Sequence, residues 1–221
     1  MTCIKCSSLR ASRTQIVEPD QPEFGRPCKV LVIGEAPGAD EDAQGKGFVG
    51  RAGRTLHALM EEHGLRRGFD YGCANVVRCR PPENRKPTKA ETETCLPLLV
   101  DFLEKVQPRA ILLVGGTPTS IFCGTGALSV RIQQCLDGRQ YSDLAHDIVQ
   151  PYLERGAPRL FAMPHTSPLA WNRNAPDGRK WSAVGADVIA ELGRWHRDSS
   201  SAPEGNIVTK EIPLESLENL V

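Results

Sequence analysis

Residues 34–53 read Gly-Glu-Ala-Pro-Gly-Ala-Asp-Glu-Asp-Ala-Gln-Gly-Lys-Gly-Phe-Val-Gly-Arg-Ala-Gly and directly follow the apolar run Val30-Leu31-Val32-Ile33. Four aliphatic residues bounded by glycine predict a short buried strand. The chain then enters a glycine-rich loop, and helical spacing resumes over residues 51–64. Ligands of open α/β sheets bind at the carboxyl ends of strands, so this loop is the first candidate for a functional site. A solvated acidic surface loop would have the same composition.

Three further apolar runs, at 74–77, 110–114 and 160–163, predict strands. Helical patterns cover 51–64, 88–106, 117–122, 143–152 and 181–195, and Thr88 with Glu91 forms a capping box at the start of the second. We therefore expect an α/β fold: one domain of three layers, α/β/α, around a central, mainly parallel four-stranded sheet. The domain is expected over residues 1–197, followed by an acidic, mobile tail over 198–221.

The totals describe an ordinary chain of 221 residues with no net charge, long enough for one α/β domain. No apolar run reaches the length that spans a bilayer, and Cys3 and Cys6 stand where a signal peptide would have its apolar core. We expect a cytoplasmic, nucleoid-associated protein that is not secreted and has no membrane partner. Lys and Arg concentrate over 46–90, which indicates a basic face.

The eight cysteines are numerous for a chain expected in the cytosol, where disulfides are rare. Cys3 and Cys6 have metal-ligand spacing, and Cys79 and Cys95 lie in and beyond a proline-rich segment. Four thiolates suit zinc or an iron–sulfur cluster, and buried cysteines without a ligand are the alternative. The other four lie in or beside apolar runs and are expected in the core: Cys28, Cys73, Cys123 and Cys135.

Three of the four predicted strands end in unusual sequence, and in a parallel sheet those ends meet in one cleft. Asn75 offers a donor and an acceptor together, as a pyrimidine edge requires, although an Asn at a strand end more often bonds to backbone. His165 stands between two prolines, which would hold its imidazole where it could stabilise a developing anion; a surface histidine is the alternative. Leu169 to Asn174 could insert into a base stack or simply pack as a loop.

Together these segments resemble family 4 uracil-DNA glycosylases, the iron–sulfur branch of the uracil-DNA glycosylase superfamily. The matching residues, in chain order, are Cys3-x-x-Cys6, Arg13-Thr14, Gly34-Glu-Ala-Pro-Gly38, Glu41-Asp42, Gly45, Phe48-Val-Gly-Arg-Ala-Gly53, Asn75-Val-Val-Arg-Cys-Arg-Pro-Pro82, Asn84-Arg85, Pro87, Cys95 and His165-x-Ser167-Pro168-Leu169. The resemblance implies an enzyme of DNA repair that flips uracil out of DNA and hydrolyses its N-glycosidic bond, leaving an abasic site.

The resemblance also assigns a role to individual residues. Four thiolates would hold a [4Fe–4S] cluster of structural role: Cys3, Cys6, Cys79 and Cys95. The pocket would be built from the backbone of Gly34, Glu35 and Ala36. Phe48 would stack on the uracil and Asn75 would read its edge. His165 would stabilise negative charge on the uracil O2, and Leu169 would fill the gap that the flipped nucleotide leaves.

The water-activating residue is less defined, because Ala36 occupies the position where superfamily members commonly carry an Asp. Glu35 is the first candidate to orient the water, with Glu41 or Asp42 second. Two further departures from the family pattern, Gly47 and Thr166 in place of prolines, are expected to loosen their loops. Gly38 carries no side chain that would exclude thymine, so the substrate range could extend to other deaminated bases.

Two other interpretations remain open: a catalytically weak or inactive superfamily member that binds uracil or DNA, and a zinc-ribbon-like structural protein without a nucleic-acid role. The partner of the favoured interpretation is DNA containing uracil, bound by a monomer. The tail from Ile207 to Val221 alternates apolar and acidic residues. It could contact a replication clamp, and an inert extension is the favoured alternative.

Overall fold

The computed structural model describes residues 3–23, 25–139, 141 and 143–201. Four strands form one sheet in the order β2-β1-β3-β4, and every neighbouring pair is parallel. The strands are β1 (Val30–Gly34), β2 (Tyr71–Asn75), β3 (Ala110–Val114) and β4 (Arg159–Met163). The expected α/β fold with a central, parallel, four-stranded sheet is confirmed.

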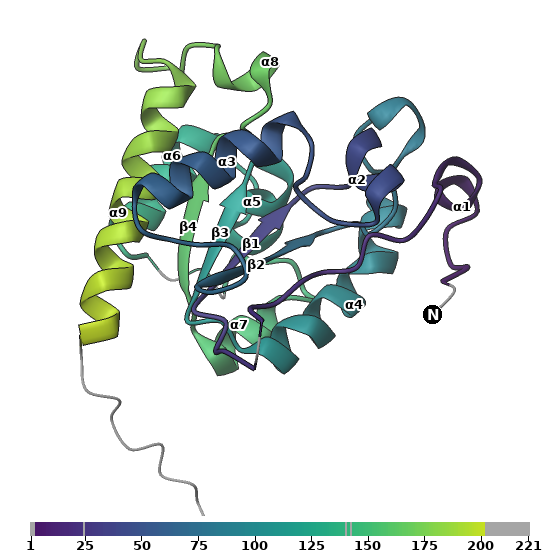
Figure 1. Ribbon diagram of the computed structural model, residues 1–221, viewed down its shortest axis with the longest axis horizontal. Helices are drawn as coiled ribbons and strands as arrows, with labels where there is room; N and C mark the ends of the chain where they lie inside the picture. Colours follow the sequence, from purple (N-terminus) through teal and green to yellow (C-terminus); the bar gives the residue numbers. More distant parts are fainter. Residues whose placement is uncertain (1–2, 24, 140, 142, 202–221) are drawn as a thin grey trace, which may run out of the picture.

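Helices lie on both faces of the sheet. The helices found in the described part of the chain are α1 (Ser7–Ser12), α2 (Ala39–Gln44), α3 (Arg51–Glu62), α4 (Lys89–Val106), α5 (Gly116–Cys123), α6 (Leu128–Leu136), α7 (Gln150–Gly156), α8 (Pro168–Trp171) and α9 (Trp181–Ser201). A 3-10 turn spans Pro82–Asn84. The chain crosses from β1 to β2 through α3 and in the opposite direction, from β2 to β3, through α4. Because such crossovers are right-handed, the two helices lie on opposite faces. Figure 1 shows α3 with α9 on one side and α4 with α7 on the other.

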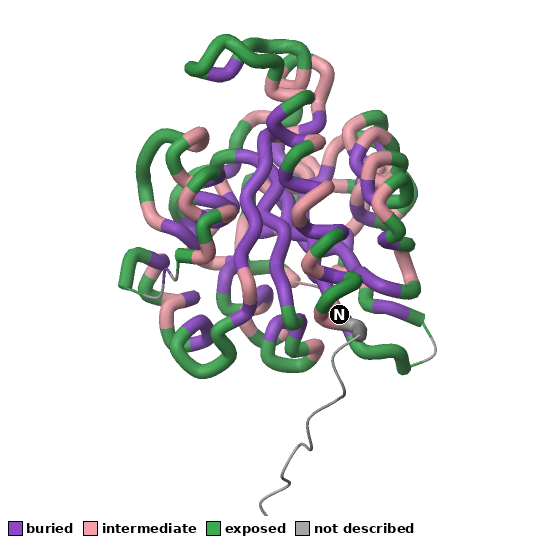
Figure 2. Tube along the Cα trace, turned by 90° about the vertical axis from the view of Figure 1, so that its left-hand side faces the viewer, coloured by how far each residue is buried: buried purple, intermediate pink, exposed green. Residues whose placement is uncertain are grey.

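The core is centred on the strands, which Figure 2 shows as a buried band between the helices. Val30, Leu31, Val32 and Ile33 are fully buried. Burial on both faces explains why the strand is a continuous apolar run instead of an alternating pattern. Each such side chain contributes roughly 1.5–3 kcal/mol of hydrophobic stabilisation. The sheet is therefore a rigid platform, and its carboxyl edge carries the loops of interest.

Some elements differ from the sequence-based expectation. Strand β2 ends at Asn75 instead of residue 77, although Val76 and Val77 still donate backbone hydrogen bonds to the carbonyls of Gly34 and Glu35. The helix expected over 143–152 is wrong: turns occupy most of residues 143–149, and the helices of this region are α6, at Leu128–Leu136, which packs against β4, and α7, which begins at Gln150. Both helices are short, so their apolar faces cover too few turns to give a clear period.

The glycine-rich loop after β1 contains the short helix α2, and the N-terminal arm, expected as loop, contains α1. Three acids in the first turn of α2 favour its formation, because carboxylates stabilise a helix N-terminus. Helix α9 runs through Ser201 and so includes the first residues expected in the tail. The rest of that tail lies outside the described residues. Within the described part, no helix has both the length and the apolar character needed to cross a bilayer.

Candidate active site

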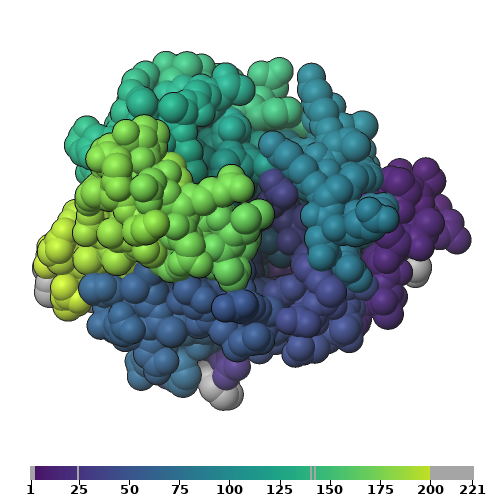
Figure 3. All heavy atoms as spheres, turned by 90° about the horizontal axis from the view of Figure 1, so that it is seen from above, coloured from purple at the N-terminus to yellow at the C-terminus, as the bar shows by residue number. Residues whose placement is uncertain are grey.

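A cavity of about 390 Å³ opens at the carboxyl edge of the sheet. Its lining includes Phe48 from the loop after β1, Asn75 from the end of β2 and His165 from the segment after β4. Figure 3 shows the hollow from above, with the region after β1 at its floor between the segments that follow β2 and β4. The three strand ends thus meet, and the volume suits a small flat ligand.

The base of the cavity depends on Gly34, the last residue of β1. A Cβ at this position would lie 2.5 Å from Asn75 Oδ1 and 2.7 Å from Phe48 Cζ. Only a residue without a side chain lets the amide and the phenyl ring approach the strand together. Gly34 therefore backs the cavity, while Glu35 and Ala36 line it.

The amide of Asn75 is available to a ligand. Its side chain lines the cavity, and within the described part of the chain it makes no hydrogen bond to protein. The commoner alternative, an Asn bonded to backbone at a strand end, is therefore not what the structure shows. A free amide beside a phenyl ring can pair with an edge that presents a donor and an acceptor.

The imidazole of His165 is held in one tautomer. Its Nδ1 accepts a hydrogen bond from the backbone N–H of Ser167 at 3.0 Å. Burial lowers the pKa of His165, and the carboxylates of Glu35 and Glu41 oppose that shift in part. The ring is therefore neutral at neutral pH, with its proton on Nε2. A neutral Nε2–H facing a cavity is a donor for an oxygen that gains negative charge.

Thr166, expected to loosen this loop, instead ties it down. Its side chain is buried, and its hydroxyl donates to the carbonyl of Ala52 in α3 at 2.8 Å. A proline at the same position has no hydroxyl and could not make this bond. The segment that carries His165 is therefore fixed to the helix on the other side of the cavity.

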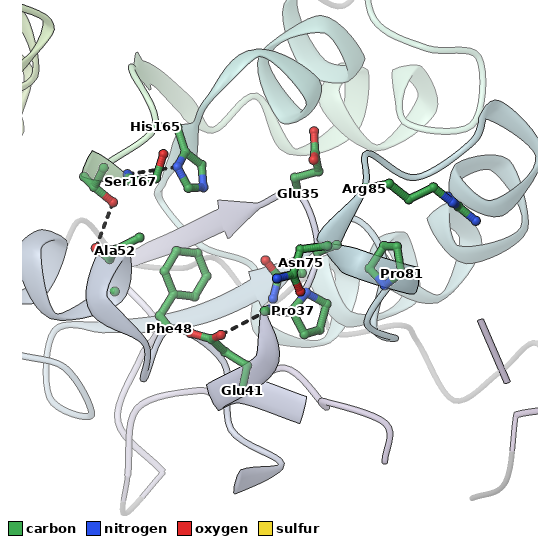
Figure 4. Close-up of a pocket in the computed structure, with 15 residues that line it drawn as sticks. Glu35, Pro37, Glu41, Phe48, Ala52, Asn75, Pro81, Arg85, His165 and Ser167 are labelled. Atoms are coloured by element: carbon green, nitrogen blue, oxygen red, sulfur yellow. Dashed lines mark hydrogen bonds between the residues drawn. The ribbon is translucent and has the colours of Figure 1, made fainter. Parts of the chain in front are cut away.

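The three acids considered for water activation differ in how they are engaged. Glu35 accepts a hydrogen bond from the hydroxyl of Thr117 in α5, and in Figure 4 its carboxylate points away from Phe48 and Asn75. Glu41 accepts from the N–H of Gly38 at 3.1 Å and of Gly50 at 2.7 Å. Asp42 is buried outside the cavity lining and accepts from the N–H of Thr14. Glu41 and Asp42 therefore fasten backbone, which leaves Glu35 as the stronger candidate.

Leu169 lies in α8 and is 72 % exposed, so it does not pack as an ordinary loop residue. Two residues further on, the indole of Trp171 packs over Gly185 of α9, where a Cβ would lie 2.4 Å from its Cη2. The indole thus anchors a turn whose other large apolar side chain faces solvent. The side chain of Leu169 is therefore accessible at the protein surface.

Six of the eight cysteines are buried in the core, and Cys79 and Cys95 are among them. Cys28, Cys73, Cys123 and Cys135 are buried in the core. The other four gather around the N-terminal arm: a cavity of about 740 Å³ is lined by Cys3, Cys79 and Cys95. The pKa of Cys6 is raised by burial and by the neighbouring thiols of Cys3 and Cys79.

Arg13 also belongs to this group, since it donates to Cys79 Sγ at 2.8 Å and to the carbonyl of Cys3 at 2.7 Å. In the described ranges, no three ligating side chains stand close enough together to bind a single metal ion. A four-iron cluster spreads its thiolates further apart, because each one binds a different iron.

Several residues of the site were given no role from the sequence. Thr117, which holds Glu35, follows Gly115-Gly116 at the end of β3, the strand end that was not counted among the unusual ones. Gly115 packs against His165, with a Cβ position 3.4 Å from the ring. Arg85 lines the cavity and pairs with Glu91 of α4 through both of its terminal nitrogens. The glycine pair directly after an apolar strand was the available signal for the first two.

Comparison with known proteins agrees with this geometry. Residues 22–186 match the model of the uracil DNA glycosylase superfamily. The chain is 40 % identical over 113 residues to a type-4 uracil-DNA glycosylase of Pyrobaculum aerophilum, covering 51 % of this chain and 55 % of the relative. It is 39 % identical over 128 residues to that of Thermotoga maritima (58 % and 64 %) and 42 % identical over 116 residues to that of Archaeoglobus fulgidus (52 % and 55 %).

The aligned part therefore spans somewhat more than half the length of these relatives. The family model, in contrast, covers most of this chain and includes all four strands and the cavity that they form. The resemblance given by the motifs is thereby confirmed, and the chain belongs to the uracil DNA glycosylase superfamily.

Proposed function

We propose that this protein is a type-4 uracil-DNA glycosylase of DNA repair, which flips uracil out of DNA and hydrolyses its N-glycosidic bond. The observation that supports this most is the meeting of Phe48, Asn75 and a neutral His165 in one cavity. A phenyl face, an amide and an imidazole N–H are together complementary to a flat pyrimidine whose O2 becomes anionic. The curated relatives carry the same activity in their names.

In the proposed reaction, uracil leaves the base stack and enters the cavity, because its glycosidic bond cannot be reached inside a duplex. The base stacks on Phe48 and pairs with Asn75. The bond between C1′ and N1 breaks, and its electron pair goes to the uracil. Nε2–H of His165 stabilises the charge that builds on O2. Water adds to C1′ and gives up one proton, and the uracil anion takes up one proton, so that an abasic site and free uracil remain.

Glu35 is the residue that we assign to orienting the water. Its hydrogen bond from Thr117 fixes one carboxylate oxygen and leaves the other free. Ala36, where superfamily members commonly carry an Asp, has no group for this task. Single-turnover excision by Glu35→Gln tests the assignment: we expect a slower release of uracil at unchanged DNA binding. Wild-type rates in this variant would remove Glu35 from the mechanism.

Cys3, Cys6, Cys79 and Cys95 are proposed to hold a [4Fe–4S] cluster. The gathering of four thiols beside Arg13 supports this, because a cation stabilises thiolates and the cluster they bind. The cluster would supply no chemistry to the glycosidic bond and would tie the N-terminal arm to the segment after β2. Anaerobically purified protein should be brown, with about four irons per chain. A colourless protein that contains zinc would support a zinc-binding structural role instead.

The proposed partner is DNA containing uracil. We propose that the protein binds it as a monomer and has no membrane partner. Exposed Leu169 is the side chain proposed to fill the gap in the duplex. Activity on DNA agrees with the expected cytoplasmic, nucleoid-associated location. The contact with a replication clamp, to which an inert extension was the favoured alternative, concerns residues 207–221, which lie outside the described part.

One assay separates the proposed enzyme from a uracil- or DNA-binding module. A labelled oligonucleotide with one uracil is incubated with stoichiometric protein, and abasic sites are cleaved with alkali. We expect complete conversion, and a matched oligonucleotide with thymine measures specificity. An oligonucleotide that is bound but stays intact would favour the binding module.

A further inference from the structure

Phe48, the residue proposed to stack on uracil, has a backbone conformation that does not persist unaided. Its φ is +57°, in the left-handed region that residues with a side chain rarely adopt. Such a conformation costs on the order of 1 kcal/mol or more and is found where the surroundings impose it. The residue before it, Gly47, adds no stiffness of its own. Something beyond the local sequence must therefore hold this ring in place.

Two side chains behind the loop bind the backbone on either side of this conformation. Arg67 donates from Nη2 to the carbonyl of Gly47 at 2.7 Å. His57, on α3, places Nε2 3.0 Å from the carbonyl of Phe48. The two peptide planes that fix the direction of the phenyl ring are thus each held by one side chain.

These two side chains are themselves held from the sheet. The hydroxyl of Tyr71, on β2, lies 2.8 Å from His57 Nδ1. Arg67 pairs with Asp20, which in turn accepts from the backbone N–H of Cys73 at 2.9 Å. The loop is therefore connected through hydrogen bonds to a buried strand, the most rigid part of the molecule.

The protonation of His57 agrees with this arrangement. Burial, together with the charge of Arg67, lowers the pKa of His57 to about 4, so the ring is neutral at neutral pH. Nε2 also lies 3.0 Å from Nη1 of Arg67, and one nitrogen cannot donate to the carbonyl and accept from the guanidinium at once. We assign the proton to Nε2, so that the ring donates to the carbonyl of Phe48 and accepts from Tyr71; the contact with Arg67 Nη1 is then not a hydrogen bond.

We propose that His57 and Arg67 are positioning residues for the Phe48 platform and supply the rigidity that Gly47 does not. The inference rests on the proposed function. The tolerance at this site is small, because a Cβ on Gly34 would already lie 2.7 Å from the phenyl ring. A loop released from His57 lets the ring turn away from the floor of the cavity. The base then loses its stacking surface although Asn75 and His165 stay in place.

A double-mutant cycle on single-turnover uracil excision tests this. Phe48→Ala should reduce kcat/KM by about 5- to 150-fold, the loss of one stacked base. His57→Leu should reduce it by about tenfold in the wild-type background and by less than about twofold in the Phe48→Ala background, because the effect acts through the ring. His57→Gln, which keeps a donor for the carbonyl, should recover most of the loss. Inhibition by free uracil should weaken in parallel in His57→Leu.

His63→Leu, a change of the other histidine of this region, at the end of α3, is the matched control and should leave excision unchanged. Equal losses from His57→Leu in both backgrounds would overturn the inference, since they would indicate a general effect on folding. So would a His57→Gln variant as impaired as His57→Leu. If wild-type protein releases no uracil, the proposed function fails and the inference falls with it; an active wild type with additive losses overturns the inference alone. Should His57→Leu be insoluble, Tyr71→Phe gives the same cycle with a smaller expected loss.

Discussion

The cavity wall around Phe48 and the turn that carries Leu169 lie at the same edge of the sheet but are built in opposite ways. Phe48 touches the strand floor, and hydrogen bonds from two side chains hold the backbone on either side of it. Leu169 is 72 % exposed, and its short helix is anchored mainly by one indole over Gly185. The region proposed to recognise the base is held in place by contacts within the protein. The region proposed to enter the duplex presents an apolar side chain to solvent.

The comparison predicts that changes in the cavity wall affect every substrate, whereas changes in the turn affect only duplex DNA. A base in a single strand needs no help to leave a stack, so a wedge gives it little advantage. Excision from single- and double-stranded oligonucleotides, measured side by side, therefore distinguishes the two regions.

The largest effect is expected from His165→Ala. Removing one donor to a developing anion costs about 10²- to 10³-fold in rate. Excision should fall by that amount on single- and double-stranded DNA alike, with DNA binding and thermal unfolding close to wild type. A loss confined to duplex DNA would place His165 with the turn instead of the cavity.

Leu169→Ala should lower excision from duplex DNA by roughly tenfold and leave the single-stranded substrate within about twofold, because only the duplex has a gap to fill. A uracil opposite an abasic site, which is already unstacked, should restore most of the rate. Equal losses on both strands would show that Leu169 supports the fold or the cavity and does not act as a wedge.

The pH profile should fall on the acid side. Burial lowers the pKa of His165, so the folded protein takes up this proton only below the range of an exposed histidine, which titrates at about 6.5. Once protonated, Nδ1 can no longer accept from Ser167, and the orientation of the ring is lost. The excision rate should drop as the pH falls through this lowered pKa, by up to about tenfold per pH unit. Stability should decrease in the same direction, because the unfolded state binds the proton first.

The single-turnover rate is measured between about pH 8 and pH 5, under conditions where thermal unfolding shows the protein folded. His165→Ala should lack this acid limb. A wild-type rate that stays level or rises in acid would mean that an imidazolium, and not a neutral ring, is the active form.

The smallest effect is expected from Gly185→Ala. The added methyl group would stand 2.4 Å from the indole of Trp171 and push the turn away from α9. We expect about a threefold loss on duplex DNA only, and combining the change with Trp171→Leu should relieve the clash. Gly156→Ala, where an added Cβ meets nothing closer than 3.6 Å, is the control. Wild-type duplex activity in Gly185→Ala would show that this anchor does not position Leu169.

Much of the fold could be predicted because its strands are buried on both faces. All five residues of Ala110–Val114 are apolar and buried, so the sequence alone indicates that this strand lies in the core. The capping box of Thr88 and Glu91 was equally local and is confirmed at the start of α4. Helix α6 was missed because its buried residues, Ile132 and Cys135, gain their meaning only from β4, against which it packs.

The amino-acid sequence by itself determined that there are four buried strands in a parallel sheet, and it identified the loops that follow them. Through long motifs it also determined the family. The tertiary structure decided what those loops do to one another. The carboxylates of Glu41 and Asp42 accept hydrogen bonds from backbone N–H groups. Thr166, which was expected to loosen its loop, fixes it by a hydrogen bond to Ala52. His57 and Arg67 contact the backbone carbonyls of Phe48 and Gly47. The physical reason is the separation in sequence of the residues that interact. A buried strand is visible as a run of consecutive apolar residues. The hydrogen bond of Thr166 joins residues 114 positions apart, so no local sequence pattern predicts its geometry.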